Sequence, residues 1–469
     1  MIDADQSRAT RVCYHFIPMI LSATGVGRDA AQSMMSDRFQ RLKLVTLTML
    51  VALPLNAGRT QGVETYEQPP ISYSTTESRD PLVKVRSRVA AGEITFSGSA
   101  KEIVERLLRE LHIPVDSQML VFSKTSLQRP RIRPDHPRAV YFSDTCYVGW
   151  VPGGLIEVVG IDPSLGPVFY SFDPNTTGAK FVRDNDCLSC HGGSFVRGIP
   201  GVFARSVFTD EDGEMLLRHG SQVVDFRTPF TNRWAGWYVT GKHGTALHRG
   251  NVLAREKDGE LVVDLTRGAN VSDLSPFFET KSYLAAGSDI VALLVFEHQT
   301  AMQNTLTRAS HDCRRMLAYQ KNLQSDLKEP VTEELTYDSV KRVFDSTAKD
   351  VVDDLLFKGE AVLPRGIEGS ASFQSAFRAE ARRDSEGRTL KDFDLNGRLF
   401  QNRCSYLIYS ESFLLLPEIL KQKVYARLIH ALHPTQSDPR YAYLGADERS
   451  RITSILQQTH PEFRKAFGL

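Results

Sequence analysis

Short apolar runs separated by turn residues fill the part of the chain that follows Arg138. Clusters such as Pro152-Gly153-Gly154 break these runs, and runs of this length and spacing are typical of β-strands. We expect strands at 139–142, 146–151, 155–161, 168–172, 202–208, 237–240 and 261–265. The acidic stretch 210–214 predicts a hairpin turn rather than a calcium loop, because it lacks the full twelve-residue calcium pattern.

The pattern becomes helical beyond Pro276. Residues 290–319 contain no proline or glycine and predict one long helix, and apolar residues spaced three and four apart predict further helices at 332–357, 370–383, 417–432 and 446–458. An earlier helix follows the capping box that Ser99 begins. We therefore predict an α+β fold, in which a β-rich central region (87–275) precedes an α-helical domain (276–469).

The start of the chain has the composition of an export signal, but not at residue 1. From Met35 a basic stretch leads into the apolar run 44–55, and small or polar residues follow. The run is too short to span a bilayer, so 35–62 is predicted to be a cleaved signal peptide. An uncleaved anchor and a buried helix are the alternatives. Residues 1–34 are polar and mixed, which indicates an over-extended start. The range 63–86, rich in Pro, Ser, Thr and charge, predicts a linker.

The overall charge excludes some classes of partner. The chain has 57 Lys and Arg against 56 Asp and Glu, so nothing indicates a nucleic acid or an anionic membrane surface as a partner. No later apolar segment is long enough to span a membrane. After signal cleavage we therefore expect no membrane span.

The segment Cys187-Leu188-Ser189-Cys190-His191 has the Cys-x-x-Cys-His signature of haem c attachment. Two thiols at this spacing form thioethers with the two vinyl groups of one porphyrin, and the adjacent histidine supplies the proximal iron ligand. Half of a zinc site, a redox dithiol and a local disulfide are the alternatives. A zinc site would need two further ligands at characteristic spacing, and no second Cys-x-x-Cys or His-x-x-x-His occurs. We expect one covalent haem c, which agrees with export.

The remaining cysteines of the mature chain are Cys146, Cys313 and Cys404. Because their number is odd, at most one disulfide can form among them, and one thiol should be buried and inert. The sequence does not select the pair.

The sixth position of the iron separates an electron carrier from an enzyme. His298 and Met302 are four residues apart and share one face of the long predicted helix, and His243 and His248 lie in a glycine-rich segment. These four residues are the sixth-ligand candidates. Ordinary helix packing is the alternative for the first pair, and a hydrogen-bonded loop histidine is the alternative for the second. Met215 and His219, which flank a predicted turn, are weaker candidates.

Other side chains are candidates for the haem pocket. Trp234 and Trp237 could form a wall of the porphyrin site and exclude water, although filling the core is an equal alternative. Arg233 and Arg205 could pair with haem propionates, and surface salt bridges are the alternative for them.

Three segments of the chain carry a resemblance to a known family. They are 187–193 (CLSCHGG), 233–244 (RWAGWYVTGKHG) and 297–302 (EHQTAM). Together they resemble an exported bacterial cytochrome-c-like family with one Cys-x-x-Cys-His motif in a large domain, unlike the compact all-helical single-haem cytochromes. The resemblance extends over most of 86–469 and implies haem binding and electron transfer.

The sequence therefore favours an exported, periplasmic c-type cytochrome that exchanges electrons with a redox partner protein or a small-molecule donor or acceptor. Two alternatives remain open. One is a haem enzyme, peroxidase-like or a small-molecule oxidoreductase, with an open sixth position. The other is a sensor or scaffold in which the haem is structural.

Overall fold

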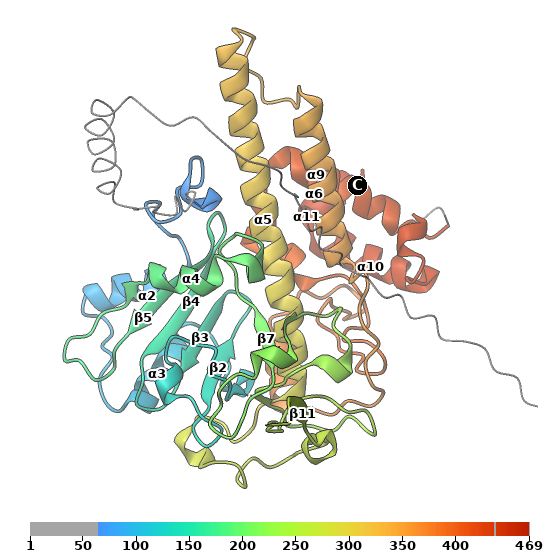
Figure 1. Ribbon diagram of the computed structural model, residues 1–469. Coiled ribbons are helices and arrows are strands. Elements are labelled where there is room, and N and C mark those ends of the chain that lie inside the picture. The colour runs from blue at the N-terminus through green and yellow to red at the C-terminus, as the bar shows by residue number, and fades with distance from the viewer. Residues whose placement is uncertain (1–63, 436–437, 469) are drawn as a thin grey trace, which may run out of the picture. The chain divides into compact units, whose positions relative to one another are not determined.

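The computed structural model describes residues 64–435 and 438–468, and its centre is a seven-stranded antiparallel sheet with the order β6-β5-β4-β3-β2-β1-β9 (Figure 1). The strands are β1 (Met119–Val121), β2 (Arg138–Phe142), β3 (Cys146–Trp150), β4 (Ile156–Asp162), β5 (Gly166–Phe172), β6 (Val182–Arg183) and β9 (Trp237–Tyr238). Two small hairpin sheets accompany it: β7 (Ala204–Val207) with β8 (Ser221–Val224), and β10 (Arg255–Lys257) with β11 (Glu260–Val262). The α+β prediction is confirmed.

The predicted strands and their turns occur close to their expected positions. The Pro-Gly-Gly turn after β3 closes through the N–H of Gly154, which donates to the carbonyl of Val151 at 2.9 Å. The acidic stretch 210–214 forms the predicted hairpin turn, in which the N–H of Asp210 donates to the carbonyl of Glu214 at 3.1 Å.

Helices cover both faces of the large sheet. On one face lie α2 (Pro81–Ala90) and α3 (Ala100–Glu110), and α3 begins with the predicted capping box of Ser99 and Glu102. On the other face lies α5 (Ile290–Asp326), which starts at its N-cap Asp289. Side chains alternate along each strand, so Tyr141 of β2 packs with the first layer while Val140 and Phe142 pack with α5.

The predicted helical half is also confirmed. It contains α6 (Asp338–Leu355), α7 (Ala371–Ala379), α8 (Glu411–Leu414), α9 (Glu418–Ala431), α10 (Ala446–Thr459) and α11 (Pro461–Ala466). These helices share one apolar core with the sheet across α5. The ring of Phe142 in β2 lies 5.8 Å from that of Phe296 in α5 and 5.9 Å from that of Phe373 in α7.

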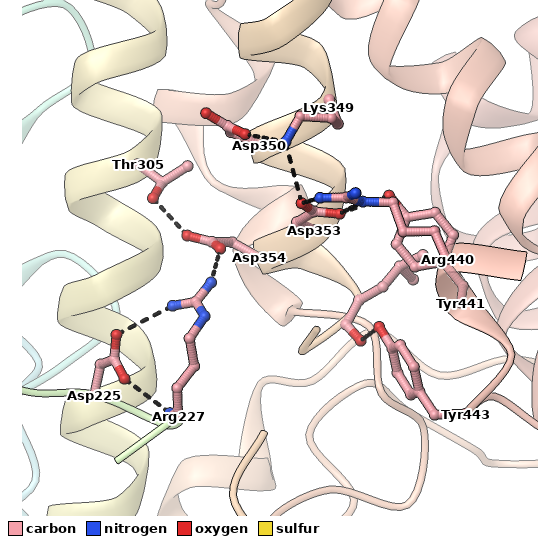
Figure 2. Close-up of polar contacts among 11 residues, drawn as sticks. Asp225, Arg227, Thr305, Lys349, Asp350, Asp353, Asp354, Arg440, Tyr441 and Tyr443 are labelled. Carbon is pink, nitrogen blue, oxygen red and sulfur yellow. Dashed lines mark hydrogen bonds and ion pairs between the residues drawn. The ribbon is translucent and has the colours of Figure 1, made fainter. Parts of the chain in front are cut away.

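Charged side chains also connect the central region to the helices (Figure 2). Arg227, which follows β8, pairs with Asp354 of α6, and the hydroxyl of Thr305 in α5 donates to the same carboxylate at 2.5 Å. One residue earlier in α6, Asp353 accepts hydrogen bonds from the Arg440 guanidinium and, at 2.9 Å, from the Tyr441 hydroxyl. These contacts fix α6 against both α5 and the last part of the chain.

The range 63–86 differs from the linker that its composition predicts. Tyr66, Ile71 and Tyr73 are buried in the core beside α2 and α3, and α2 itself begins inside this range. The Tyr73 hydroxyl donates to the carbonyl of Pro167 at 2.7 Å. The composition misleads because the segment is anchored by separate large side chains rather than by a periodic apolar face.

Two expectations concern residues outside the described range, namely the over-extended start (1–34) and the signal peptide (35–62). Among the described residues, no helix has both the length and the apolar character needed to cross a membrane.

Candidate functional site

The Cys-x-x-Cys-His motif directly follows the edge strand β6. The N–H of Asp184 donates to the carbonyl of Phe169 in β5 at 2.9 Å, and the Asp184 side chain caps the next turn by accepting from the N–H of Asp186. The chain then forms the short helix α4 (Leu188–His191), which lies beside the β4–β5 part of the sheet (Figure 1). Because the motif is helical, side chains three residues apart lie on the same side, as two thiols bound to one porphyrin require.

The two motif cysteines are free thiols. Cys190 is exposed, whereas Cys187 is half-buried. Burial raises the pKa of Cys187 to about 12, and the carboxylates of Asp184 and Glu157 add to the effect. A thiol with a raised pKa remains protonated at neutral pH and is a weak nucleophile, which disfavours a redox dithiol.

His191 is held in the tautomer that an iron ligand needs. Its Nδ1 lies 2.9 Å from the carbonyl oxygen of Gly201, and a carbonyl can only accept, so Nδ1 carries the proton. The lone pair is therefore on Nε2, as in metal-bound histidines whose other nitrogen donates to a backbone carbonyl. Burial lowers the pKa of His191, which keeps the ring neutral. The rings of Phe169 and Phe203 flank it with centroids at 5.0 and 5.2 Å.

The loop after the motif closes back on His191 and is anchored to α5. The N–H of Gly201 donates to the backbone carbonyl of His191 at 2.8 Å, which closes the loop a second time. Asn304 of α5 then binds both backbone groups of Val202: it accepts from the N–H at 3.1 Å and donates to the carbonyl at 2.8 Å. The position of the imidazole thus depends on the long helix.

Gly192 has a steric role in this loop. A Cβ at this position would collide with the hydroxyl of Tyr66 and lie 2.9 Å from the carbonyl oxygen of Leu188. Glycine therefore lets the N-terminal segment pack closely behind the motif.

The residues present fit a covalently attached haem better than they fit the alternatives. Two free thiols and one oriented imidazole match haem c. Between 64 and 435 and between 438 and 468, no group of three or more His, Cys, Asp or Glu side chains gathers in an arrangement that could hold a metal ion. A structural zinc site needs four such ligands, so this finding does not support the zinc alternative.

Cys146, Cys313 and Cys404 are all buried free thiols. The disulfide that the sequence permits among them is therefore not formed. Burial raises the pKa of each of these thiols, in Cys313 to about 12, which agrees with inert core positions.

The structure gives His298 and Met302 positions in the core between α5 and the C-terminal helices. Both are completely buried, and His298 stacks on Phe357 with ring centroids 4.1 Å apart. Its Nε2 lies 2.9 Å from the Ser405 hydroxyl. At 3.6 residues per turn, His298 and Met302 are about 120° and 160° around the helix from Asn304, the residue that holds the motif loop. α5 therefore directs these two side chains away from the motif.

His243 and His248 lie together, with ring centroids 4.7 Å apart, but their hydrogen bonds do not suit iron ligation. Nε2 of His243 accepts from the N–H of Asn270 at 3.0 Å, and Nδ1 of His248 accepts from the N–H of Gly250 at 2.9 Å. In a neutral ring the other nitrogen then carries the proton and has no lone pair for a metal. Burial lowers the pKa of His248 to about 3, so its ring is neutral at ordinary pH.

Arg233 and Trp234 belong to a buried network around Glu297 of α5. The Arg233 guanidinium donates to one carboxylate oxygen at 2.5 Å, and the Trp234 indole donates to the other at 2.5 Å. Arg233 also donates to the carbonyls of Thr228 and Phe226. Both side chains are buried and hydrogen-bonded to Glu297, so the expected roles of Arg233 as a propionate partner and of Trp234 as a porphyrin wall do not fit their positions.

Trp237 and Arg205 lie nearer to the motif. The Trp237 indole is buried under β7, where it donates to the carbonyl of Arg205 at 2.8 Å. The Arg205 guanidinium lies 4.9 Å from the ring centroid of Phe195, a residue of the motif loop. Of the two arginines expected to bind propionates, Arg205 is therefore the one beside the motif. His219 pairs instead with Glu256 at 3.2 Å, and Met215 forms an isolated bridge to Thr209.

Sequence reasoning missed several residues that build the site, namely Phe169, Gly201, Phe203 and Asn304. Phe169 contacts His191 because of the strand register, and Asn304 reaches the motif loop because α5 packs against it. Neither contact is local in the sequence, so no local pattern indicates these residues.

The chain was also compared with protein-family models, curated proteins and solved structures, and none of the three comparisons found a match.

Proposed function

We propose that this chain is an exported c-type cytochrome that carries one haem, linked covalently at Cys187 and Cys190 and ligated by His191, and that it transfers electrons. The hydrogen bond from Nδ1 of His191 to Gly201 carries the proposal, because it leaves Nε2 with its lone pair in a histidine next to two free thiols. The resemblance of three chain segments, of which one is the motif itself, to an exported cytochrome-c-like family agrees with it. Haem c, when bound, supplies a one-electron ferric–ferrous couple.

The chain's own residues would orient the iron ligand and limit water around it. Phe169 and Phe203 fix the ring plane of His191, and Gly201 fixes its tautomer. Asn304 secures the loop that carries Gly201. Such contacts reduce reorganisation around the metal, because the ligand does not move when the charge of the iron changes.

The attachment is tested by intact mass spectrometry of protein made with a haem c maturation system. We expect the polypeptide mass plus one haem, export to the periplasm, and a mature chain that begins at Val63. Replacing Cys187 or Cys190 with serine should reduce covalent haem, whereas Cys146→Ala, a change to a buried thiol outside the motif, should leave the haem load unchanged. A wild-type protein with the mass of the bare polypeptide would contradict the proposal.

A haem enzyme is the second candidate, and one observation favours it. Each proposed sixth ligand is either held in the core or hydrogen-bonded in an unsuitable tautomer, as described for His298 and His248. An open sixth position would allow peroxide or oxygen chemistry. Spectra separate the two functions: low-spin bands that ignore cyanide and carbon monoxide indicate a carrier, and high-spin iron that binds them and consumes peroxide indicates an enzyme.

A further inference from the structure

One end of the sheet face that α5 covers carries a row of small and polar residues. Cross-strand register places Gly149 of β3 opposite Glu157 of β4, Glu157 opposite Ser171 of β5, and Ser171 opposite Val182 of β6. Residues directly opposite one another point to the same face. We call these four residues the strip.

The strip becomes more exposed towards the edge of the sheet, since Gly149 is buried, Glu157 and Ser171 are partly exposed and Val182 is exposed. Phe142 and Tyr147, on the same face under α5, are buried, whereas Val182 is 60% exposed. The end of the strip at the edge strand β6 is therefore accessible, whereas the part of this face under α5 is not.

The strip adjoins the haem-attachment motif. Phe169, which contacts His191, points to the same face as Ser171, two residues further along β5. Val182 precedes Cys187 by only five residues. The chain therefore leads from the strip directly into the motif.

An ion pair lies on the strip. The Arg138 guanidinium pairs with Glu157 across Gly149, and each side chain is only 22% exposed. A Cβ at position 149 would collide with the guanidinium, so the glycine makes room for this pair. Glu157 lies directly opposite Ser171, so the pair is on the same sheet face as Phe169, the residue whose ring contacts His191.

We propose that the strip is the surface on which the attached haem lies, and that Arg138 and Glu157 are positioning residues that set its reduction potential. This inference rests on the proposed function. Ferric haem carries one more positive charge than ferrous haem, so a nearby carboxylate favours the ferric state and a nearby guanidinium favours the ferrous state. In the intact pair the two effects largely cancel.

The first test places a new charge on the strip. Val182→Glu should lower the midpoint potential measured by equilibrium redox titration, and the shift should shrink at high salt. Val262→Glu is the matched control, since Val262 of β11 is also an exposed strand valine, 52% accessible, but belongs to a separate two-stranded sheet. Equal potentials for the two variants would overturn the inference.

The second test uses the ion pair itself. At a fixed applied potential, Glu157→Gln should lower the ferric-to-ferrous ratio and Arg138→Gln should raise it, each by roughly three- to tenfold. The double variant should return close to the wild-type ratio. Shifts of the same sign, or no shifts, would overturn the inference, and if either pair variant fails to fold, Val182→Glu decides.

The amount of bound haem shows whether a negative result refutes the location of the haem on the strip or the proposed function itself. Wild-type protein without haem overturns both. Protein that carries haem, but whose potential responds no more to Val182→Glu than to Val262→Glu, overturns only the location of the haem and leaves the cytochrome proposal standing.

Discussion

Asn304 is predicted to be the main tertiary anchor of the loop that orients His191. Its side chain makes two hydrogen bonds to one residue, since it binds both the N–H and the carbonyl of Val202. Replacing it with alanine removes both bonds and leaves two partly buried backbone groups without their partners. A net hydrogen bond contributes about 1 kcal/mol, and an unpaired buried group adds a desolvation cost, so Asn304→Ala should lower the free energy of unfolding by about 2–3 kcal/mol.

Asn322→Ala is the matched control for this prediction. Asn322 is exposed on the same helix, so both substitutions bring the same gain in helix propensity, about 0.7 kcal/mol or less. Urea unfolding followed by circular dichroism gives both free energies. If the two variants differ by less than about 0.5 kcal/mol, the side chain of Asn304 does not hold the loop.

Two further predictions concern buried charges and histidines. Arg233→Met should lower the free energy of unfolding by about 3–5 kcal/mol because it strands the Glu297 carboxylate, and denaturant titration should show a larger loss at pH 8 than at pH 5. Burial raises the pKa of Glu297 to about 7, although the charge of Arg233 acts to lower it. Without Arg233 the pKa in the folded state should rise further above that of the unfolded state, so the stability of the variant should fall as pH rises. An equal loss at both pH values would contradict this reasoning. His298 has a pKa lowered to about 3 by burial, so its neutral ring stabilises the fold above pH 6.5 and this contribution is lost as pH falls from 6.5 towards 3. His298→Asn should reduce the acid-side slope of unfolding free energy against pH by up to about 1.4 kcal/mol per pH unit, whereas the exposed control His430→Asn should leave it unchanged.

The parts of the fold that the sequence predicted are those in which local pattern and burial agree. The strand Ile156–Asp162 and the helix Ile290–Asp326 are buried over most of their length and contain no proline. The range 63–86 was misjudged because Tyr66 and Tyr73 are anchors whose partners lie elsewhere in the chain, and single aromatics in a Pro- and Ser-rich context have no periodicity to detect.

In the candidate site, too, the residues set by local sequence were predictable and those set by long-range contacts were not. The proposed haem attachment would need Cys187, Cys190 and His191 close together in the chain, so the motif is visible in the sequence. What orients the imidazole is not local: Asn304 comes from another layer of the fold, and Phe169 reaches His191 through strand pairing. The sixth-ligand candidates illustrate the limit, because His298 and Met302 do share a helix face, but that face is directed towards Ser405 rather than towards the motif.

The helix α5 explains why the β-rich and helical parts cannot be treated as independent cores. One side of it binds strand β3, where the amide of Gln299 donates to the Tyr147 hydroxyl at 2.8 Å, and another side holds Ser405 through His298. Asn304 extends the same element to the motif loop. Separating the chain between residues 275 and 276 would remove α5 from the face of the sheet. It would also remove Asn304 from the loop that orients His191. The change in sequence pattern near residue 276 therefore marks a change of secondary structure within a shared core. The position of His191, the proposed iron ligand, depends on both sides of it.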